Sequence, residues 1–71
     1  MKNLRDNLYE FRVTRKLSQD DLAKMIGVSR KTYWSIEKGL SDGSLRFWRR
    51  LQEVFGLSSL ELVELMKNAE D

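Results

Sequence analysis

The chain contains four glycines and no proline, and the placement of these helix breakers constrains its fold more than any other feature. Proline-free segments that end at glycine are typical of helices joined by short turns. Leucine, isoleucine and aromatic residues recur at helical spacing within these segments. We therefore predict an all-α fold of short helices, and a chain of 71 residues can bury one small core.

Serine residues mark where helices are expected to begin. Ser18 is followed three residues later by Asp21, and Ser58 by Glu61, which is the capping-box pattern of a helix start. Ser29 and Ser44 are further N-cap candidates. We expect five helices, over residues 3–15, 19–27, 29–38, 44–56 and 59–68. The inner face of the fourth is expected to be Leu45, Trp48, Leu51 and Phe55.

Residue types needed for several kinds of catalytic or metal site are missing. The chain has no cysteine and no histidine, which excludes disulfides, thiol nucleophiles and the commonest metal ligand. No apolar segment approaches the roughly 20 residues of a membrane span, and no signal-peptide pattern is present. We therefore expect a soluble cytoplasmic protein that is not an enzyme and uses no cofactor, metal or membrane.

Charge is distributed unevenly along the chain. Residues 1–50 contain 12 Lys and Arg against 6 Asp and Glu, whereas residues 51–71 contain one Lys against 5 acids. The basic part indicates a polyanionic partner such as nucleic acid. The acidic end also fits an ordinary solvated helix surface.

A tight turn is expected between the second and third helices, at Ile26, Gly27 and Val28. A turn of three or four residues that contains glycine, between two short helices, is typical of a helix-turn-helix motif. Apolar residues occur where the two helices would pack on each other, at Leu22, Ala23, Ile26, Val28, Tyr33 and Ile36. The outward face of the third helix would then carry Arg30, Lys31, Thr32, Trp34 and Ser35.

Residues 17–23 (LSQDDLA), 26–32 (IGVSRKT) and 36–39 (IEKG) resemble the Xre family of helix-turn-helix DNA-binding proteins, the Cro/repressor group of phages and bacteria. The resemblance extends from Leu4 to about Leu65. It implies a lambda-repressor-like fold in which residues 1–71 form a single helix-turn-helix DNA-binding domain. Two features differ from the usual pattern: Lys16 stands in place of a glycine, and the loop 40–43 contains Asp42 instead of basic residues or proline.

The resemblance implies that the third helix reads base edges in the major groove, mostly with residues near its N-terminal end. The base-reading candidates are Arg30, Lys31, Trp34 and Ser35. An alternative for Trp34 is that it folds back toward the fourth helix as a core residue. Gln19 is expected to contact phosphate from a helix N-terminus, which favours anions. Further phosphate candidates, by the same resemblance, are Ser29, Thr32 and Lys38.

The resemblance also implies a largely buried ion pair between Arg12 in the first helix and Glu37 at the end of the third. Removing one partner of such a pair strands a buried charge. We therefore expect Arg12 and Glu37 to be structural, with no part in catalysis or base reading.

The function implied by the resemblance is a transcriptional regulator, most simply a small Cro-like repressor from a bacterium or phage that binds a palindromic operator as a homodimer. The partner is double-stranded DNA. Candidate dimer residues are Phe47, Leu57 and Leu60, which could instead complete the core of a monomer. The alternative function is a protein-binding module, such as an antitoxin or a regulator sequestered by a protein partner. Trp34, Phe47 and Tyr9 would then be its aromatic anchors.

Overall fold

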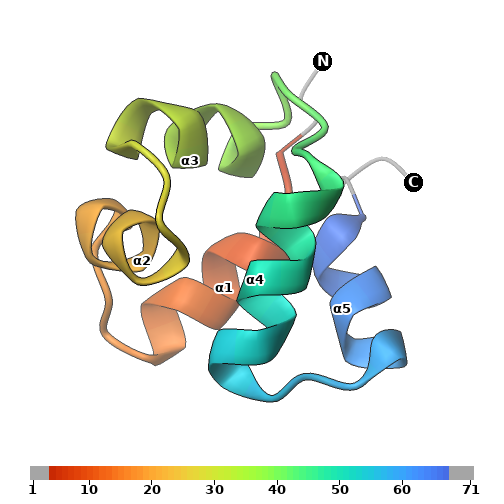
Figure 1. Cartoon of the computed structure of the whole chain (residues 1–71). Coiled ribbons are helices and arrows are strands. Elements are labelled where there is room, and N and C mark those ends of the chain that lie inside the picture. The colour runs from red at the N-terminus through yellow and green to blue at the C-terminus, as the bar shows by residue number, and fades with distance from the viewer. Residues whose placement is uncertain (1–3, 68–71) are drawn as a thin grey trace.

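The computed structural model describes residues 4–67, and every element of regular structure in this part of the chain is an α-helix (Figure 1). The helices are α1 (Asp6–Thr14), α2 (Gln19–Ile26), α3 (Arg30–Glu37), α4 (Leu45–Phe55) and α5 (Ser59–Met66). The predicted all-α, lambda-repressor-like class is therefore confirmed. The predicted ends of the first and last helices, at Asn3 and Asn68, lie outside the described residues. Within the described residues both helices are shorter than predicted, because α1 begins only at Asp6 and α5 ends at Met66.

Serine caps fix where four of these helices begin. At the start of α2, Ser18 Oγ accepts the backbone N–H of Asp21 and Asp21 Oδ2 accepts that of Ser18, both at 3.0 Å. Ser58 and Glu61 form the same pair of bonds at the start of α5. Ser29 and Ser44 cap α3 and α4 through their hydroxyl groups. These bonds satisfy N–H groups that have no partner inside the helix.

The connection between α1 and α2 contains an unusual backbone conformation at Lys16. Its φ angle is +58°, and among residues 4–67 no other residue except glycine has a positive φ. The left-handed region brings the Cβ of an L-residue close to the following carbonyl, whereas glycine has no Cβ to clash. The lysine at this position therefore keeps the turn that glycine usually makes, under local strain.

The core receives side chains from all five helices. It is formed by Leu8, Leu22, Ala23, Ile26, Tyr33, Ile36, Phe47, Trp48, Leu51 and Leu65. Half-buried residues close its edges, among them Phe11 and Phe55, whose rings meet edge to face with centroids 5.0 Å apart. The tight turn after α2 is part of this packing, because half-buried Val28 also rests on the core.

The inner face of α4 differs from the prediction. Leu45 is 71% exposed, while Phe47 is only 2% exposed and packs edge to face on Trp48. Leu51 marks the core side of α4, and Phe47 lies four residues before it, on the same side of the helix. Leu45 lies six residues before Leu51, roughly 120° around the helix, and so points outward.

The loop between α3 and α4 is held by Trp48 and Gly43. The indole Nε1 of Trp48 donates a hydrogen bond of 3.0 Å to the carbonyl oxygen of Asp42. Gly43 has a φ of +80°, and a Cβ at this position would lie 2.7 Å from the same Nε1. A glycine is therefore needed here both for the backbone conformation and for the close approach of the indole.

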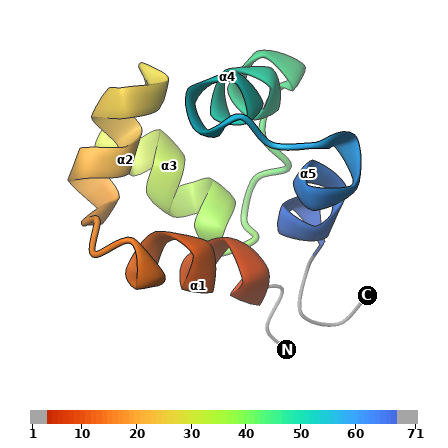
Figure 2. The same ribbon diagram turned by 90° about the horizontal axis from the view of Figure 1, so that it is seen from below.

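The arrangement of the helices leaves one side of α3 free. α3 lies across one end of the molecule, with α2 packed beneath it and α4 running through the centre of the view (Figure 1). Seen from below, α2 and α5 lie at opposite ends of the view, α1 and α4 lie on its other two sides, and α3 is seen between them (Figure 2). Since the other helices all lie on one side of α3, its opposite side faces outward.

Candidate nucleic-acid interface

The turn between α2 and α3 fixes the orientation of α3. Gly27, with a φ of +93°, ends α2, and the N–H groups of Gly27 and Val28 both donate to the carbonyl of Ala23, at 2.8 and 3.0 Å. Ser29 Oγ then accepts the N–H of Thr32 at 3.0 Å and donates to Thr32 Oγ1 at 2.9 Å. These bonds satisfy the backbone groups of the turn and of the first residues of α3, and they set the direction in which α3 leaves the turn.

The base-reading candidates gather on the outward side of α3. Arg30, Lys31 and Trp34 are exposed, and Ser35 is half-buried. Trp34 does not fold back into the core, since 39% of its surface is exposed. It lines a shallow depression of about 360 Å³ together with Gln19, Arg30 and Lys31. The structure thus places an aromatic ring beside two cations and the N-terminal residue of α2.

The phosphate candidates lie around this face and differ in their exposure and hydrogen bonding. Lys38 is exposed directly after α3, while the hydroxyls of Ser29 and Thr32 are engaged in the helix cap. Gln19 is half-buried, and its Nε2 donates a hydrogen bond of 2.9 Å to Glu37 Oε1. An amide group carries a second N–H and an acceptor oxygen, so Gln19 can still bind a further group.

Glu37 is the centre of a buried polar network. Arg12 Nε donates to its Oε2 at 2.8 Å and Arg12 Nη2 to its Oε1 at 3.2 Å. The hydroxyl of Tyr33 also donates to Oε2, at 2.7 Å, and Gln19 completes the set. Burial by itself raises the pKa of Glu37, but the bonds from Arg12, Tyr33 and Gln19 outweigh it and hold the pKa below its ordinary value. The sequence pattern indicated Arg12 and Glu37 but not the two neutral donors.

A second buried arginine, which sequence reasoning missed, joins three parts of the fold. Arg5 is 5% exposed, and its Nη1 donates to the carbonyls of Ile36 and Ser41 at 2.6 and 2.9 Å. Its Nε donates to the carbonyl of Met66 at 3.0 Å. No local sequence signal indicates this role, because the acceptors lie 31 to 61 residues away.

A family model described as helix-turn-helix matches residues 8–62, which is more than half of the chain and includes α2, the turn and α3. The chain belongs to the helix-turn-helix family. The Xre-type resemblance drawn from the sequence is thereby confirmed. Within residues 4–67, none of the helices has the length and apolar composition of a membrane span.

Curated relatives of this helix-turn-helix chain are named as regulators. It is 41% identical over 54 residues to an uncharacterised HTH-type transcriptional regulator of Methanocaldococcus jannaschii, covering 76% of this chain and 82% of that protein. It is 37% identical over 54 residues to the cryptic phage CTXphi transcriptional repressor RstR of Vibrio cholerae, covering 76% of this chain and 49% of RstR. An uncharacterised HTH-type transcriptional regulator of Archaeoglobus fulgidus is 38% identical over 52 residues, which cover 73% of this chain and 74% of that protein. No solved structure gives a significant match.

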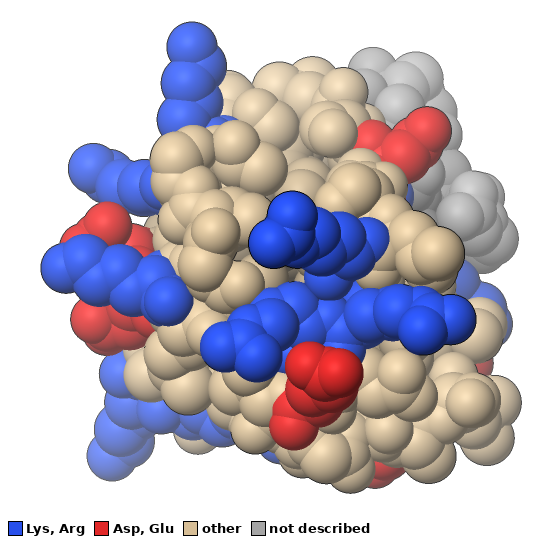
Figure 3. All heavy atoms as spheres, in the orientation of Figure 1, with Lys and Arg blue, Asp and Glu red and all other residues tan. Residues whose placement is uncertain are grey.

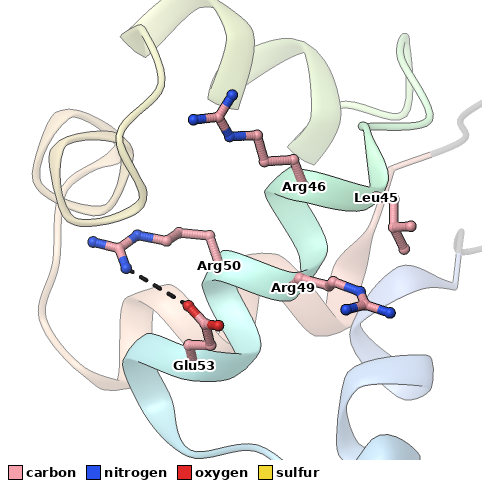
Figure 4. Close-up of a pocket in the computed structure, with 5 residues that line it drawn as sticks. All are labelled: Leu45, Arg46, Arg49, Arg50 and Glu53. Carbon is pink, nitrogen blue, oxygen red and sulfur yellow. Dashed lines mark ion pairs between the residues drawn. The ribbon is translucent and has the colours of Figure 1, made fainter.

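Outside the helix-turn-helix motif, three arginines form a group that sequence reasoning also missed. Arg46, Arg49 and Arg50, here called the α4 arginine face, line a depression of about 570 Å³ with Leu45 and Glu53 (Figure 4). In the space-filling view, basic side chains gather over α4 in the middle of this surface (Figure 3). Arg49 and Arg50 follow Arg46 by three and four residues, and such spacings put side chains on one side of a helix. This spacing was the sequence signal that could have revealed the group.

The three candidate dimer residues occupy different environments. Phe47 lies in the core, so its predicted place at a dimer interface is wrong, and the alternative that it completes the core holds. Leu57 is half-buried against the core, and Leu60 on α5 is 72% exposed. Of the aromatic anchors of the alternative function, Tyr9 and Trp34 are exposed, at 45% and 39%.

Proposed function

We propose that this chain is a transcriptional regulator that binds double-stranded DNA with sequence specificity, with α3 in the major groove. The observation that supports this best is the outward side of α3, where Arg30, Lys31 and Trp34 are exposed together. Arginine can donate two hydrogen bonds to O6 and N7 of guanine, and lysine can donate to the same edge. The names of the relatives, all HTH-type regulators or a phage repressor, agree with this role.

Phosphate contacts are assigned to residues that surround the outward side of α3. Gln19 stands at the N-terminus of α2, where the helix dipole favours an anion, and its amide is held by Glu37. Lys38 is exposed at the other end of α3, and Ser29 and Thr32 lie at its start. Ser35, half-buried one turn after Lys31, completes the base-reading set. Phosphate contacts set the register on the duplex and base contacts set the sequence preference.

We further infer that the protein acts in the cytoplasm as a homodimeric repressor on a palindromic operator. One α3 offers few base-reading side chains, whereas two copies on half-sites about 34 Å apart read one face of the duplex. Leu60 is the exposed candidate for the dimer contact, with Leu57 beside the core. Occupying DNA that polymerase needs is sufficient for repression, and RstR is named as a repressor.

The test is selection of bound duplexes from a random DNA pool with the wild-type protein and with Arg30→Ala. We expect the wild type to enrich a palindrome that contains guanine in each half, and Arg30→Ala to lose that guanine preference, at a cost of about 1–3 kcal/mol. Lys24→Ala is the matched control, because Lys24 is exposed on α2 and pairs with Asp20 at 3.3 Å. Enrichment of no sequence by the wild type would reject sequence-specific binding and favour the protein-binding alternative.

A further inference from the structure

The arginines of α4 stand where the physics of a helix disfavours them. Arg46 is the second residue of α4, and the N-terminal end of a helix carries partial positive charge, so a cation there is unfavourable. Arg49 and Arg50 follow at spacings of three and four residues, at which like charges repel. Each of these three effects, the helix dipole at Arg46 and its repulsion from Arg49 and from Arg50, costs little. All of them destabilise the helix, and neutral residues at these positions would avoid them.

Acidic residues near this surface relieve little of the repulsion. Within residues 4–67, Arg50 Nη1 lies 3.7 Å from Glu53 Oε1, and neither Arg46 nor Arg49 forms an ion pair. The side chains of Arg50 and Glu53 are 54% and 72% exposed, so water weakens their attraction. The positive charge of the α4 arginine face is therefore largely uncompensated by the described protein.

The α4 arginine face is also continuous with the helix-turn-helix motif. Arg46 and Arg50 line a groove of about 560 Å³ whose other wall is the turn between α2 and α3; the remaining lining residues are Ile26, Gly27, Val28, Ser44 and Phe47. The same turn leads directly to Ser29 and Arg30 at the start of α3. A polyanion that lies along the start of α3 therefore meets the α4 arginine face next.

We propose that the α4 arginine face binds the phosphate backbone of DNA that flanks the base pairs read by α3. This inference rests on the proposed function, because α3 has to position the duplex. A guanidinium group is permanently charged and donates two parallel hydrogen bonds to a phosphate. Phosphates at this surface neutralise the mutual repulsion of the three arginines, and the N-terminus of α4 favours an anion. The length of duplex bound thus exceeds the length whose sequence is read.

The experiment compares two duplexes that share the selected operator. One ends at the base pairs that α3 reads, and the other continues on both sides with unrelated sequence. Binding of wild type and of Arg49→Gln/Arg50→Gln is followed by fluorescence anisotropy between about 50 and 200 mM salt. Arg46 is left intact, since it lies in the first turn of α4 beside the motif. Lys16→Gln/Lys24→Gln removes the same charge from exposed residues of other segments and is the control.

On the long duplex we expect the log–log salt slope of Arg49→Gln/Arg50→Gln to be smaller in magnitude by about 1.8, which is about 0.9 for each phosphate that the variant no longer neutralises. On the trimmed duplex the double variant and wild type should have equal slopes, and the selected sequence should not change. The control variant should keep the wild-type slope on both duplexes. Because Arg49 and Arg50 are exposed, the thermal midpoint of the double variant should equal or exceed that of wild type.

Two results would overturn the inference. If the double variant keeps the wild-type slope on the long duplex while Arg30→Ala loses its guanine preference, α3 reads DNA but the α4 arginine face does not touch it. If the control variant loses as much slope as the double variant, the effect is one of total charge and no surface is assigned. Failure of the wild type to prefer any sequence would remove the proposed function, and this inference with it.

Discussion

At the scale of single residues, Glu37 connects the interior of the protein with its outward face. Its carboxylate accepts hydrogen bonds from buried Arg12 and Tyr33 and from Gln19, the first residue of α2. Because these bonds hold its pKa below the ordinary value of 4.5, the carboxylate stabilises the fold above that pH. This contribution is lost as the pH falls from 4.5 through the lower pKa of the folded state.

Replacing Glu37 should therefore be costly. We expect Glu37→Gln to lower the free energy of unfolding by roughly 3–5 kcal/mol, because Arg12 is left as a buried charge without its anion. The loss should shrink as the pH falls below 4.5, where the wild type also loses its carboxylate. Urea unfolding at several pH values measures both effects, and Glu10→Gln, at an exposed position on α1, is the control. A loss well under about 1 kcal/mol near neutral pH, the range of an exposed pair, would contradict a structural role.

Replacing Lys16 with glycine, in contrast, is predicted to raise the free energy of unfolding. Since its φ is +58°, we expect Lys16→Gly to raise the free energy of unfolding by about 0.5–1 kcal/mol, as relief of the left-handed strain exceeds the entropy cost of glycine. Lys16→Ala keeps a Cβ at the same position and should give no such gain. Urea unfolding of the three proteins is the measurement. Equal stability of the glycine and alanine variants would show that the turn is not strained.

At the scale of elements, the features that the sequence predicted are those that depend on residues close together in the chain. The capping boxes at Ser18 and Ser58 and the turn at Gly27 depend on residues a few positions apart, so the helix starts and the motif could be foreseen. The exposed side of α3 followed from the helical period. The rotation of α4, which buries Phe47, and the position of Arg5 depend on contacts between distant segments. No local pattern specifies such contacts, so these features required the structure.

The α3 element also carries a prediction about Trp34. We expect its exposed ring to contact the methyl group of a thymine in the operator, so that replacing that thymine with deoxyuridine weakens wild-type binding about fourfold, or about 0.8 kcal/mol for one buried methyl group. Trp34→Ala should bind the thymine and deoxyuridine duplexes equally, because the ring that senses the methyl is gone. Anisotropy titrations with each thymine replaced in turn measure this. If no replacement affects the wild type, or if Trp34→Ala shows the same loss, Trp34 does not read thymine.

At the scale of the whole molecule, the position of charge matters more than its total. The net charge is only +2, yet basic side chains gather on the outward side of α3 and on the α4 arginine face, while the exposed acids are spread over α1, α2, α4, α5 and the loop before α4. Local potential, rather than net charge, steers a polyanion to a surface. With basic side chains gathered on α3 and α4, the molecule can present a positive surface to a duplex at a modest total charge.

The proposed homodimer predicts how affinity depends on the spacing of half-sites. If two copies of the chain contact each other while each α3 reads one half, an intact palindrome should bind far more tightly than a single half-site. Inserting about five base pairs, half a helical turn, between the halves turns one half-site to the opposite face of the duplex, so affinity should fall to that of a single half-site.

Leu60→Asp, at a position 72% exposed on α5, should cause the same fall on the intact palindrome without weakening half-site binding. Anisotropy titrations with the three duplexes measure these affinities. Equal affinity for the palindrome and the half-site would mean that the protein binds as independent monomers, and a loss of half-site binding in Leu60→Asp would mean that Leu60 supports the fold instead of the dimer.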